Sequence, residues 1–324
     1  MLSCHTEGGV QVHITDRINS KKWGVFHHYL YNIQNNPRFT NNQNAGETDW
    51  NTCTEELNVK HLAKTLHEIG AGYYFITVMQ GRKYMIAEND AYRNIVGDKT
   101  ADDCLSRRDL IETLYRELSQ YDIDLYLYFT GDGPYKDEPI GKLFGFTEPR
   151  QNIAMGFVKK WSDVLREYSL RYGNKVKGWW LDGMYQQEFG YTEELMQPYY
   201  RAIKEGNPDA IVAFNNGIKP YIYRYYPEEE FTSGEQVDLS VIPESRFQNG
   251  AQTHILLPIG AEGREIGATW AGSGLNYTKE ELCAYAQKVI SAGGIVTFDC
   301  KLNRDGSFDD EQVEALRYIG SQLR

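Results

Sequence analysis

A buried strand that ends on a carboxylate is the strongest chemical signal in the sequence. Residues 176–181 are mostly β-branched, aromatic or aliphatic, which is typical of a buried strand, and Asp182 follows them directly. Gly183 then lets the backbone turn away. A charge at the end of a buried strand must be solvated, paired or used in chemistry. Asp182 is therefore either a catalytic carboxylate or a residue that begins a turn or caps the next helix.

Polar side chains also follow other strands of the predicted sheet. His28, Gln80 and Tyr128 stand near the ends of three such segments, and Asn215 ends a fourth. The carboxyl ends of parallel strands meet at one face of a barrel, which is where catalytic groups of barrel enzymes lie. We therefore expect these side chains to share one pocket with Asp182.

The elements that must position this pocket alternate regularly between strand and helix. The predicted strands are 23–29, 73–79, 123–130, 176–182, 209–215, 236–242, 252–259 and 295–300. The predicted helices are 54–69 (with Thr54 as its N-cap), 107–121, 153–172, 192–205, 278–291 and 309–323. Eight such units in 324 residues predict an α/β fold of the (β/α)8 TIM-like barrel type, with a single domain over 1–324.

Composition restricts the class of partner. The net charge is −11, the pI is about 5.2 and no long basic run occurs, so nucleic acid and membranes are not expected partners. The 24 Tyr and 6 Trp offer flat apolar faces with polar edges, which suit sugars, although Tyr also fills half-buried strand positions. No stretch reaches the length and apolarity of a membrane span. An oligomer is compatible with these features.

The cysteines and the N-terminus bear on the compartment. The five Cys are widely spaced, which indicates neither a disulfide framework nor a zinc knuckle. Residues 1–17 lack the apolar core of a signal peptide, so a cytoplasmic location is expected, or a periplasmic or secreted one if a leader has been removed.

Metal and nucleophilic-serine chemistry are weaker alternatives. His27, His28, Asp132 and Asp182 could form a divalent site, but adjacent strand residues point to opposite faces, so one of the two histidines must face away. No GxSxG motif occurs. The sequence therefore predicts neither a metal nor another cofactor.

Motifs along nearly the whole chain carry a family resemblance. The chain resembles the α-L-fucosidases of glycoside hydrolase family 29. The similar segments are Trp-Gly-Val-Phe-His-His-Tyr at 23–29, the helix-to-strand passage 62–79, the passage 108–130, Trp-Leu-Asp-Gly at 180–183, the segment 207–212, and 277–323 with Ser-Ala-Gly-Gly at 291–294.

The resemblance implies a retaining glycosidase that acts on an oligosaccharide or glycoconjugate. It implies that Asp182 is the nucleophile and that His28 hydrogen-bonds a sugar hydroxyl. Asp49 and Trp50 match the family's acidic-aromatic pair near the sugar. The resemblance also implies that Tyr128 and Trp180 line the same sugar subsite.

This chain departs from the family at several sugar-binding positions. The family usually has two adjacent histidines where this chain has Met79 and Gln80. It often has an arginine where this chain has Asn215, Asn216 and Gly217, and the tryptophan-glutamate pair of some members falls near 251–252. Lost hydroxyl-reading groups usually change the substrate, so we expect slow turnover of simple aryl α-L-fucosides. No C-terminal β-sandwich is expected.

A retaining glycosidase also needs a second carboxyl group as acid and base. Glu235 is the preferred candidate, because it follows a segment similar to the family loop that supplies the acid in some members. Glu244, Glu262 and Glu265 stay open as alternatives. The expected function is an exo-acting retaining glycoside hydrolase for an α-L-fucoside or related glycoside; the alternative is a non-catalytic carbohydrate-binding barrel of the same descent.

One long connection is expected to cover the pocket. Residues 30–53 follow the first strand and are rich in Asn, yet they carry Asp49 and Trp50. We predict that this segment folds over the barrel mouth as a partial lid, with Trp50 packed against the sugar site.

Overall fold

The core of the molecule is a curled sheet of seven parallel strands. The computed structural model describes residues 12–35, 46–146, 152–261 and 270–323. The strand order is β5-β4-β3-β2-β1-β9-β8, and every neighbouring pair is parallel. The strands are β1 (Trp23–His27), β2 (Tyr73–Thr77), β3 (Asp124–Thr130), β4 (Val176–Asp182), β5 (Ile211–Phe214), β8 (His254–Pro258) and β9 (Ile295–Cys300). Seven of the eight predicted strands are thus confirmed.

The predicted sixth strand, 236–242, is wrong. In its place, residues 230–236 lie between β5 and β8 and bond both edges at isolated positions: the Glu230 amide donates to the Val212 carbonyl, and the Leu256 amide donates to the Gly234 carbonyl. A Cβ on Gly234 would lie 1.6 Å from the His254 carbonyl oxygen, so the backbone passes too close to β8 for another residue. The described residues therefore form a parallel sheet of seven strands and not a complete eight-stranded barrel.

The alternating polarity of 236–242 has a local explanation. The side chain of Asp238 accepts a hydrogen bond from the Ser240 amide, which is a turn and not a strand contact. Val237 and Ile242 are exposed. A short antiparallel pair follows, β6 (Phe247–Gln248) and β7 (Ala251–Gln252).

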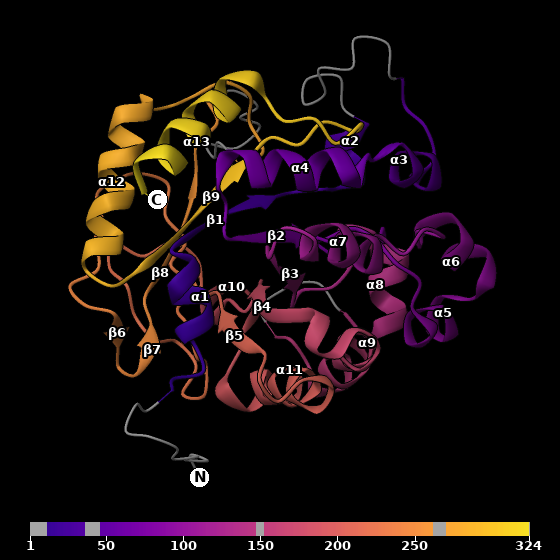
Figure 1. Ribbon diagram of the computed structural model, residues 1–324. Coiled ribbons are helices and arrows are strands. Elements are labelled where there is room, and N and C mark those ends of the chain that lie inside the picture. Colours follow the sequence, from indigo (N-terminus) through magenta and orange to yellow (C-terminus); the bar gives the residue numbers. More distant parts are fainter. Residues whose placement is uncertain (1–11, 36–45, 147–151, 262–269, 324) are drawn as a thin grey trace.

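Helices surround the outside of the sheet (Figure 1). The six long helices are α4 (Val59–Ile69), α7 (Leu110–Ser119), α9 (Met155–Tyr172), α11 (Glu193–Gly206), α12 (Lys279–Ser291) and α13 (Asp310–Leu323). Side chains begin several of them: Thr278 and Glu281 form a capping box at α12, and Thr192 caps α11.

The predicted helix 54–69 is two helices. The helix α3 (Trp50–Glu56) ends because Leu57 is extended, and Asn58 begins α4 by accepting a hydrogen bond from the His61 amide. Thr54 is therefore inside a helix and is not an N-cap. Shorter helices occupy the connections: α1 (Asp16–Lys21), α2 (Tyr31–Gln34), α5 (Asp90–Val96), α6 (Asp98–Cys104), α8 (Glu138–Phe144), the 3-10 turn η1 (Gly173–Lys175) and α10 (Gln186–Phe189).

The two faces of the sheet bury different side chains. One face packs on the helices through residues such as Val25, Ile76 and Leu127. The concave face encloses a separate, aromatic-rich cluster, which is Ile18, Phe26, Tyr73, Phe75, Tyr126, Tyr128, Trp180, Ile211, Ala213, Phe231, Leu256 and Ile295. A Cβ on Gly24 would lie 2.3 Å from the Tyr73 ring, so this strand glycine makes room for the interior aromatics.

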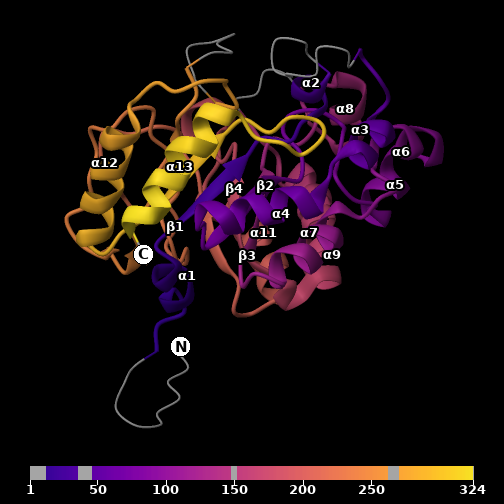
Figure 2. The ribbon, with the colours of Figure 1, turned by 45° about the horizontal axis from the view of Figure 1, so that its top comes forward.

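All seven strands run in one direction, so their carboxyl ends meet at one face. Figure 2 shows α2 and α8, which follow β1 and β3, on one side of the molecule, and α1, which precedes β1, on the other. Among the residues described, no helix has the length and apolarity needed to cross a membrane.

Candidate active site

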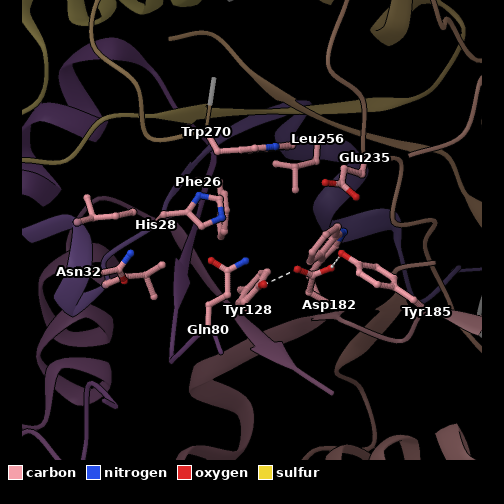
Figure 3. A pocket seen from close by; sticks show the side chains of 13 residues that line it. Phe26, His28, Asn32, Gln80, Tyr128, Asp182, Tyr185, Glu235, Leu256 and Trp270 are labelled. Atoms are coloured by element: carbon pink, nitrogen blue, oxygen red, sulfur yellow. Dashed lines mark hydrogen bonds between the residues drawn. The ribbon is translucent and has the colours of Figure 1, made fainter. Parts of the chain in front are cut away.

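A pocket of about 260 Å³ opens at the carboxyl ends of the strands (Figure 3). Sequence-predicted residues and residues from the connecting loops share its wall. The lining consists of Phe26, His28, Leu30, Asn32, Ile33, Gln80, Tyr128, Trp180, Asp182, Tyr185, Glu235, Leu256 and Trp270. The structure thus brings together six of the predicted site residues, His28, Gln80, Tyr128, Trp180, Asp182 and Glu235.

Asp182 is held by three hydrogen-bond donors at the end of β4. The Tyr128 hydroxyl donates to Oδ2 at 2.5 Å, and the Tyr185 hydroxyl and Asn215 Nδ2 donate to Oδ1 at 2.9 and 2.8 Å. These donors come from β3, from the turn after β4 and from the end of β5, so three chain segments converge on one carboxylate. Together these three hydrogen bonds fix the orientation of the carboxyl group.

Glu235 lies beside Asp182 through a shared partner. The same Asn215 Nδ2 that bonds Asp182 also donates to Glu235 Oε2 at 2.7 Å. At 2.8 and 2.7 Å from one nitrogen, the two carboxyl oxygens can be no more than 5.5 Å apart. Burial, and next the charge of Asp182, raise the pKa of Glu235 to about 8. The raised pKa keeps Glu235 protonated at neutral pH, while its neighbour Asp182 accepts three hydrogen bonds.

Asn215 has a different role from the one predicted. It does not line the pocket but is fully buried behind it. The Gly217 amide donates to Asn215 Oδ1 at 3.1 Å, which turns the amide NH2 toward both carboxyl groups. Asn215 is therefore placed to position Asp182 and Glu235, and it is not among the residues that line the pocket.

His28 is oriented by a carboxylate that the sequence analysis missed. His28 Nδ1 is 2.8 Å from Asp299 Oδ2, and the Ala271 amide donates to Asp299 Oδ1 at 2.7 Å. The ring of Trp270 lies edge-on to His28 with centroids 5.7 Å apart. Asp299 on β9 thus bonds both His28 and the backbone next to Trp270, two residues that line the pocket. The signal was present, because Asp299, like Asp182, is a charged residue near the end of a strongly apolar strand.

Aromatic rings form the floor and side of the pocket. Tyr128 and Trp180 are stacked with centroids 5.5 Å apart. The Trp180 indole donates to the Ser233 carbonyl at 3.0 Å, which ties this wall to the segment that carries Glu235. Tyr185 and Trp270, which no sequence motif indicated, complete the aromatic lining. The pocket therefore offers flat apolar faces beside polar groups, as sugar sites do.

Asp49 and Trp50 are not among the residues that line this pocket, and each has partners elsewhere. The exposed carboxylate of Asp49 caps α3, because it accepts hydrogen bonds from the Thr52 amide and hydroxyl. Trp50 is 1% exposed and its indole donates to the Met85 carbonyl in the outer core. The predicted lid places Trp50 incorrectly, and the middle of that segment, 36–45, lies outside the described residues.

Glu244 and His27, which belong to the alternative acid and metal hypotheses, do not line the pocket. Glu244 is exposed in a separate groove beside Tyr221 and Ile242. Glu262 and Glu265 lie outside the described residues. His27 points away from the pocket, packs against Phe308 and approaches the Tyr74 hydroxyl.

Burial lowers the pKa of His27 to about 3 and raises the pKa of Asp132 to about 7. In the described part of the chain, no three His, Cys, Asp or Glu side chains are arranged to hold a metal ion.

Comparison with solved structures identifies the fold. No family model and no curated protein sequence matches the chain. A trapped covalent intermediate of a family 29 α-L-fucosidase from Bacteroides thetaiotaomicron, with 2-fluoro-fucosyl fluoride, has a TM-score of 0.66 at 16% identity over 99% of this chain and 76% of that chain.

Two further structures resemble the chain to the same degree. The α-L-fucosidase isoenzyme 1 of Paenibacillus thiaminolyticus gives 0.67 at 16% identity over 96% of this chain and 75% of that one. An endo-fucoidan hydrolase of glycoside hydrolase family 107 gives 0.67 at 14% identity, over 96% and 94%. The resemblance predicted from the sequence is thus confirmed at the level of the fold, which is that of fucose-acting glycoside hydrolases.

Proposed function

We propose that this protein is a retaining glycoside hydrolase that acts on an α-L-fucoside or a related glycoside. The distance between Asp182 and Glu235 carries the proposal. Carboxyl groups about 5–5.5 Å apart are typical of retaining enzymes, whereas inverting enzymes need about 6.5–9.5 Å to admit a water molecule. The two oxygens bonded to the same Asn215 nitrogen are at most 5.5 Å apart, which is below the inverting range and supports the retaining mechanism.

The two carboxyl groups take complementary roles in this mechanism. In the first step, an oxygen of Asp182 attacks the anomeric carbon as the bond to the leaving oxygen breaks, and Glu235 gives that oxygen its proton. In the second step, Glu235 takes a proton from water, and the water oxygen displaces Asp182 from the sugar. Each step inverts the anomeric carbon, so the released sugar keeps the configuration of the substrate.

The surroundings of each carboxyl group suit its role. Asp182 accepts hydrogen bonds from Tyr128, Tyr185 and Asn215, so the nucleophile is ordered before the sugar binds. The pKa of Glu235 is raised to about 8 by burial and by Asp182, so it carries the proton that the leaving group needs. When Asp182 becomes esterified its charge disappears, which lowers the pKa of Glu235 and prepares it to act as a base.

The volume of the pocket bears on the substrate. At about 260 Å³ it is smaller than the roughly 300–1,000 Å³ of sites for drug-sized ligands, so it accommodates a single small sugar unit. This supports exo action, in which a terminal sugar is released. The similar solved structures named above are α-L-fucosidases and an endo-fucoidan hydrolase, which supports a deoxyhexose or a similar unit.

The positions at which this chain departs from the resembling family bear on which sugar the pocket binds. Gln80 lines the pocket, whereas Met79 is fully buried outside it, and Gly217 supports Asn215 through its backbone. The polar groups that face the sugar are therefore not those of the resembling family. We accordingly propose that plain aryl α-L-fucosides are turned over slowly and that another sugar or a specific linkage is preferred.

A panel of nitrophenyl glycosides tests the proposal directly. Turnover of at least one α-glycoside, abolished in Asp182→Asn, with the first-formed sugar anomer identified by NMR as the retained one, is the expected result. An inverted product would refute the paired-carboxylate mechanism. Sugar binding by calorimetry without turnover of any member would favour the alternative of a non-catalytic carbohydrate-binding protein. Turnover of nitrophenyl α-L-fucoside with kcat/KM above ~10⁴ M⁻¹s⁻¹ would contradict the expected change of substrate.

A further inference from the structure

A second hollow of about 480 Å³ adjoins the active-site pocket. Asn32, an exposed side chain in α2, lines both hollows. A second segment also joins them: Gln80 lines the active-site pocket, Arg82 lines the neighbouring hollow, and the Arg82 amide donates to the Gln80 carbonyl in one tight turn. The two hollows therefore share parts of two loops that follow β1 and β2.

The position of the second hollow relative to the carboxyl groups is informative. Figure 3 shows Asn32 on the opposite side of the active-site pocket from Asp182, Tyr185 and Glu235. In the proposed function, the anomeric carbon of the cleaved sugar lies between Asp182 and Glu235. The side of the sugar ring remote from that carbon then points toward Asn32, and a substituent on that side continues into the second hollow.

The lining of the second hollow suits a sugar. Tyr31 and Tyr84 are stacked with centroids 4.0 Å apart at 13°, and both rings also contact Trp50. The rings are thus fixed by the outer core before any ligand binds, which lowers the entropic cost of forming a binding surface. Arg82 and Asp137 supply hydrogen-bonding groups at the same hollow.

The charge of the lining indicates an uncharged ligand. Arg82 is paired with Asp137 at 3.3 Å, and the exposed carboxylate of Glu47 lies at the same hollow beside the Tyr31 hydroxyl. The lining of the second hollow therefore contains two acidic side chains and one arginine. A sulfated or carboxylated sugar would meet net repulsion there, whereas the hydroxyls of a neutral pyranose can bond both signs of charge.

We propose that this hollow is a second sugar subsite, which binds a neutral pyranose attached to the cleaved unit on the side remote from the scissile bond. The inference rests on the proposed function and adds to it a second type of substrate, in which the cleaved unit is not terminal and is released together with the further sugar that it carries. It assigns Asn32, Arg82, Tyr84 and Tyr31 to substrate recognition, and it gives a physical basis for a linkage preference.

Binding and turnover of short saccharides test this subsite. The probes are methyl α-L-fucoside and the methyl glycoside of an α-linked fucose disaccharide, titrated by calorimetry against Asp182→Asn, in which turnover is blocked. We expect the disaccharide to bind at least about tenfold more tightly than the monosaccharide. Equal affinity for both probes, or no binding of either, would overturn the subsite.

Variants localise the gain in affinity. Arg82→Ala, added to Asp182→Asn, is expected to remove most of the tenfold advantage and to leave monosaccharide binding unchanged, because Arg82 lines only the second hollow. Tyr84→Ala is a second test whose folding is checked by its melting temperature. Matched controls are Arg116→Ala, an exposed arginine paired with Glu117 on α7, and Tyr221→Ala, an exposed tyrosine in another groove. If the disaccharide keeps its full gain in affinity over the monosaccharide in both Arg82→Ala and Tyr84→Ala, the assignment of these residues to a sugar subsite is refuted.

Failure of the subsite differs from failure of the proposed function. Turnover of nitrophenyl α-L-fucoside by the wild-type protein requires the active-site pocket with its carboxyl pair, but not the second hollow. Turnover with no advantage for the disaccharide would overturn the subsite and leave the hydrolase intact. A disaccharide advantage without any turnover would support the subsite and count against the hydrolase.

Discussion

The two ends of the pocket are built in different ways. At the carboxylate end, Asp182 and Glu235 receive four hydrogen bonds from Tyr128, Tyr185 and Asn215. At the histidine end, His28 is oriented through one ring nitrogen by Asp299, and the half-buried Gln80 and the exposed Asn32 line the wall.

The difference separates the groups that react from the groups that recognise the sugar. Groups that must react are fixed by side chains from several strands, since misplacing them would cost catalysis. Groups that read the sugar stand on loops that can vary without disturbing the sheet. Changes at the carboxylate end should therefore act on kcat, and changes at the histidine end should act on KM.

The largest effect is expected from Asp182→Asn. An amide cannot form the covalent glycosyl intermediate, so kcat should fall by about 10⁴-fold or more, with the melting temperature close to that of the wild type. Asp132→Asn is the matched control, because Asp132 is a buried carboxyl group that bonds Thr130 and lines no part of the pocket. Comparable activity in the two variants would show that Asp182 is not the nucleophile.

The second effect is expected from Glu235→Gln. Hydrolysis of glycosides with unactivated leaving groups should fall by about 10²–10⁴-fold, because the proton donor is lost. The wild-type kcat/KM should decline as the pH rises through about 8, since Glu235 gives up its proton there, and this decline should be absent in the variant. The pH–rate profiles of both proteins measure it.

Glu229→Gln provides a demanding control for Glu235. Burial raises the pKa of Glu229 to about 8 as well, but its carboxylate accepts hydrogen bonds from the Phe214 and Tyr225 amides instead of facing the pocket. This variant should lower the free energy of unfolding by about 1–3 kcal/mol and keep the alkaline decline. Loss of the decline in Glu229→Gln, with its retention in Glu235→Gln, would reverse the assignment.

A smaller effect is expected from Asn215→Ala. Each carboxyl group loses one donor, so kcat should fall by about 10- to 100-fold with KM little changed. The hydrogen bond from Asn215 lowers the pKa of Glu235, so its removal should move the alkaline decline to higher pH. The neighbouring Asn216→Ala, whose side chain accepts a hydrogen bond from the Gln186 amide and also interacts with Tyr223, should leave the decline in place. A decline that moves to lower pH in Asn215→Ala would contradict this role.

The smallest effect is expected from Asp299→Asn, and it should change KM instead of kcat. The carboxylate that orients His28 becomes an amide, so KM should rise by about three- to tenfold while kcat stays within about threefold. Asp299 is a positioning residue, and the split between KM and kcat is the readout that general destabilisation would not give. A fall in kcat as large as that of Glu235→Gln would end the distinction between the two ends of the pocket.

The sequence by itself determined the sheet and the strand-end residues of the site. The strand Val176–Asp182 was predicted with its observed bounds, because buried parallel strands are continuous apolar runs that can be read locally. Asp182, His28, Gln80 and Tyr128 followed from it, since the carboxyl ends of such strands must meet at one face. The same logic, applied to Asp299, would have found the partner of His28.

Tertiary structure alone decided which loop residues reach the pocket. Glu229, Glu235 and Glu244 look alike in sequence, yet one bonds backbone amides, one faces Asp182 and one is exposed. Asp49 and Trp50 resemble a sugar-binding pair, but a helix end and the outer core provide closer partners for them. The physical reason is that a loop has no repeating pattern that sets its direction, so contacts far along the chain determine where its side chains point.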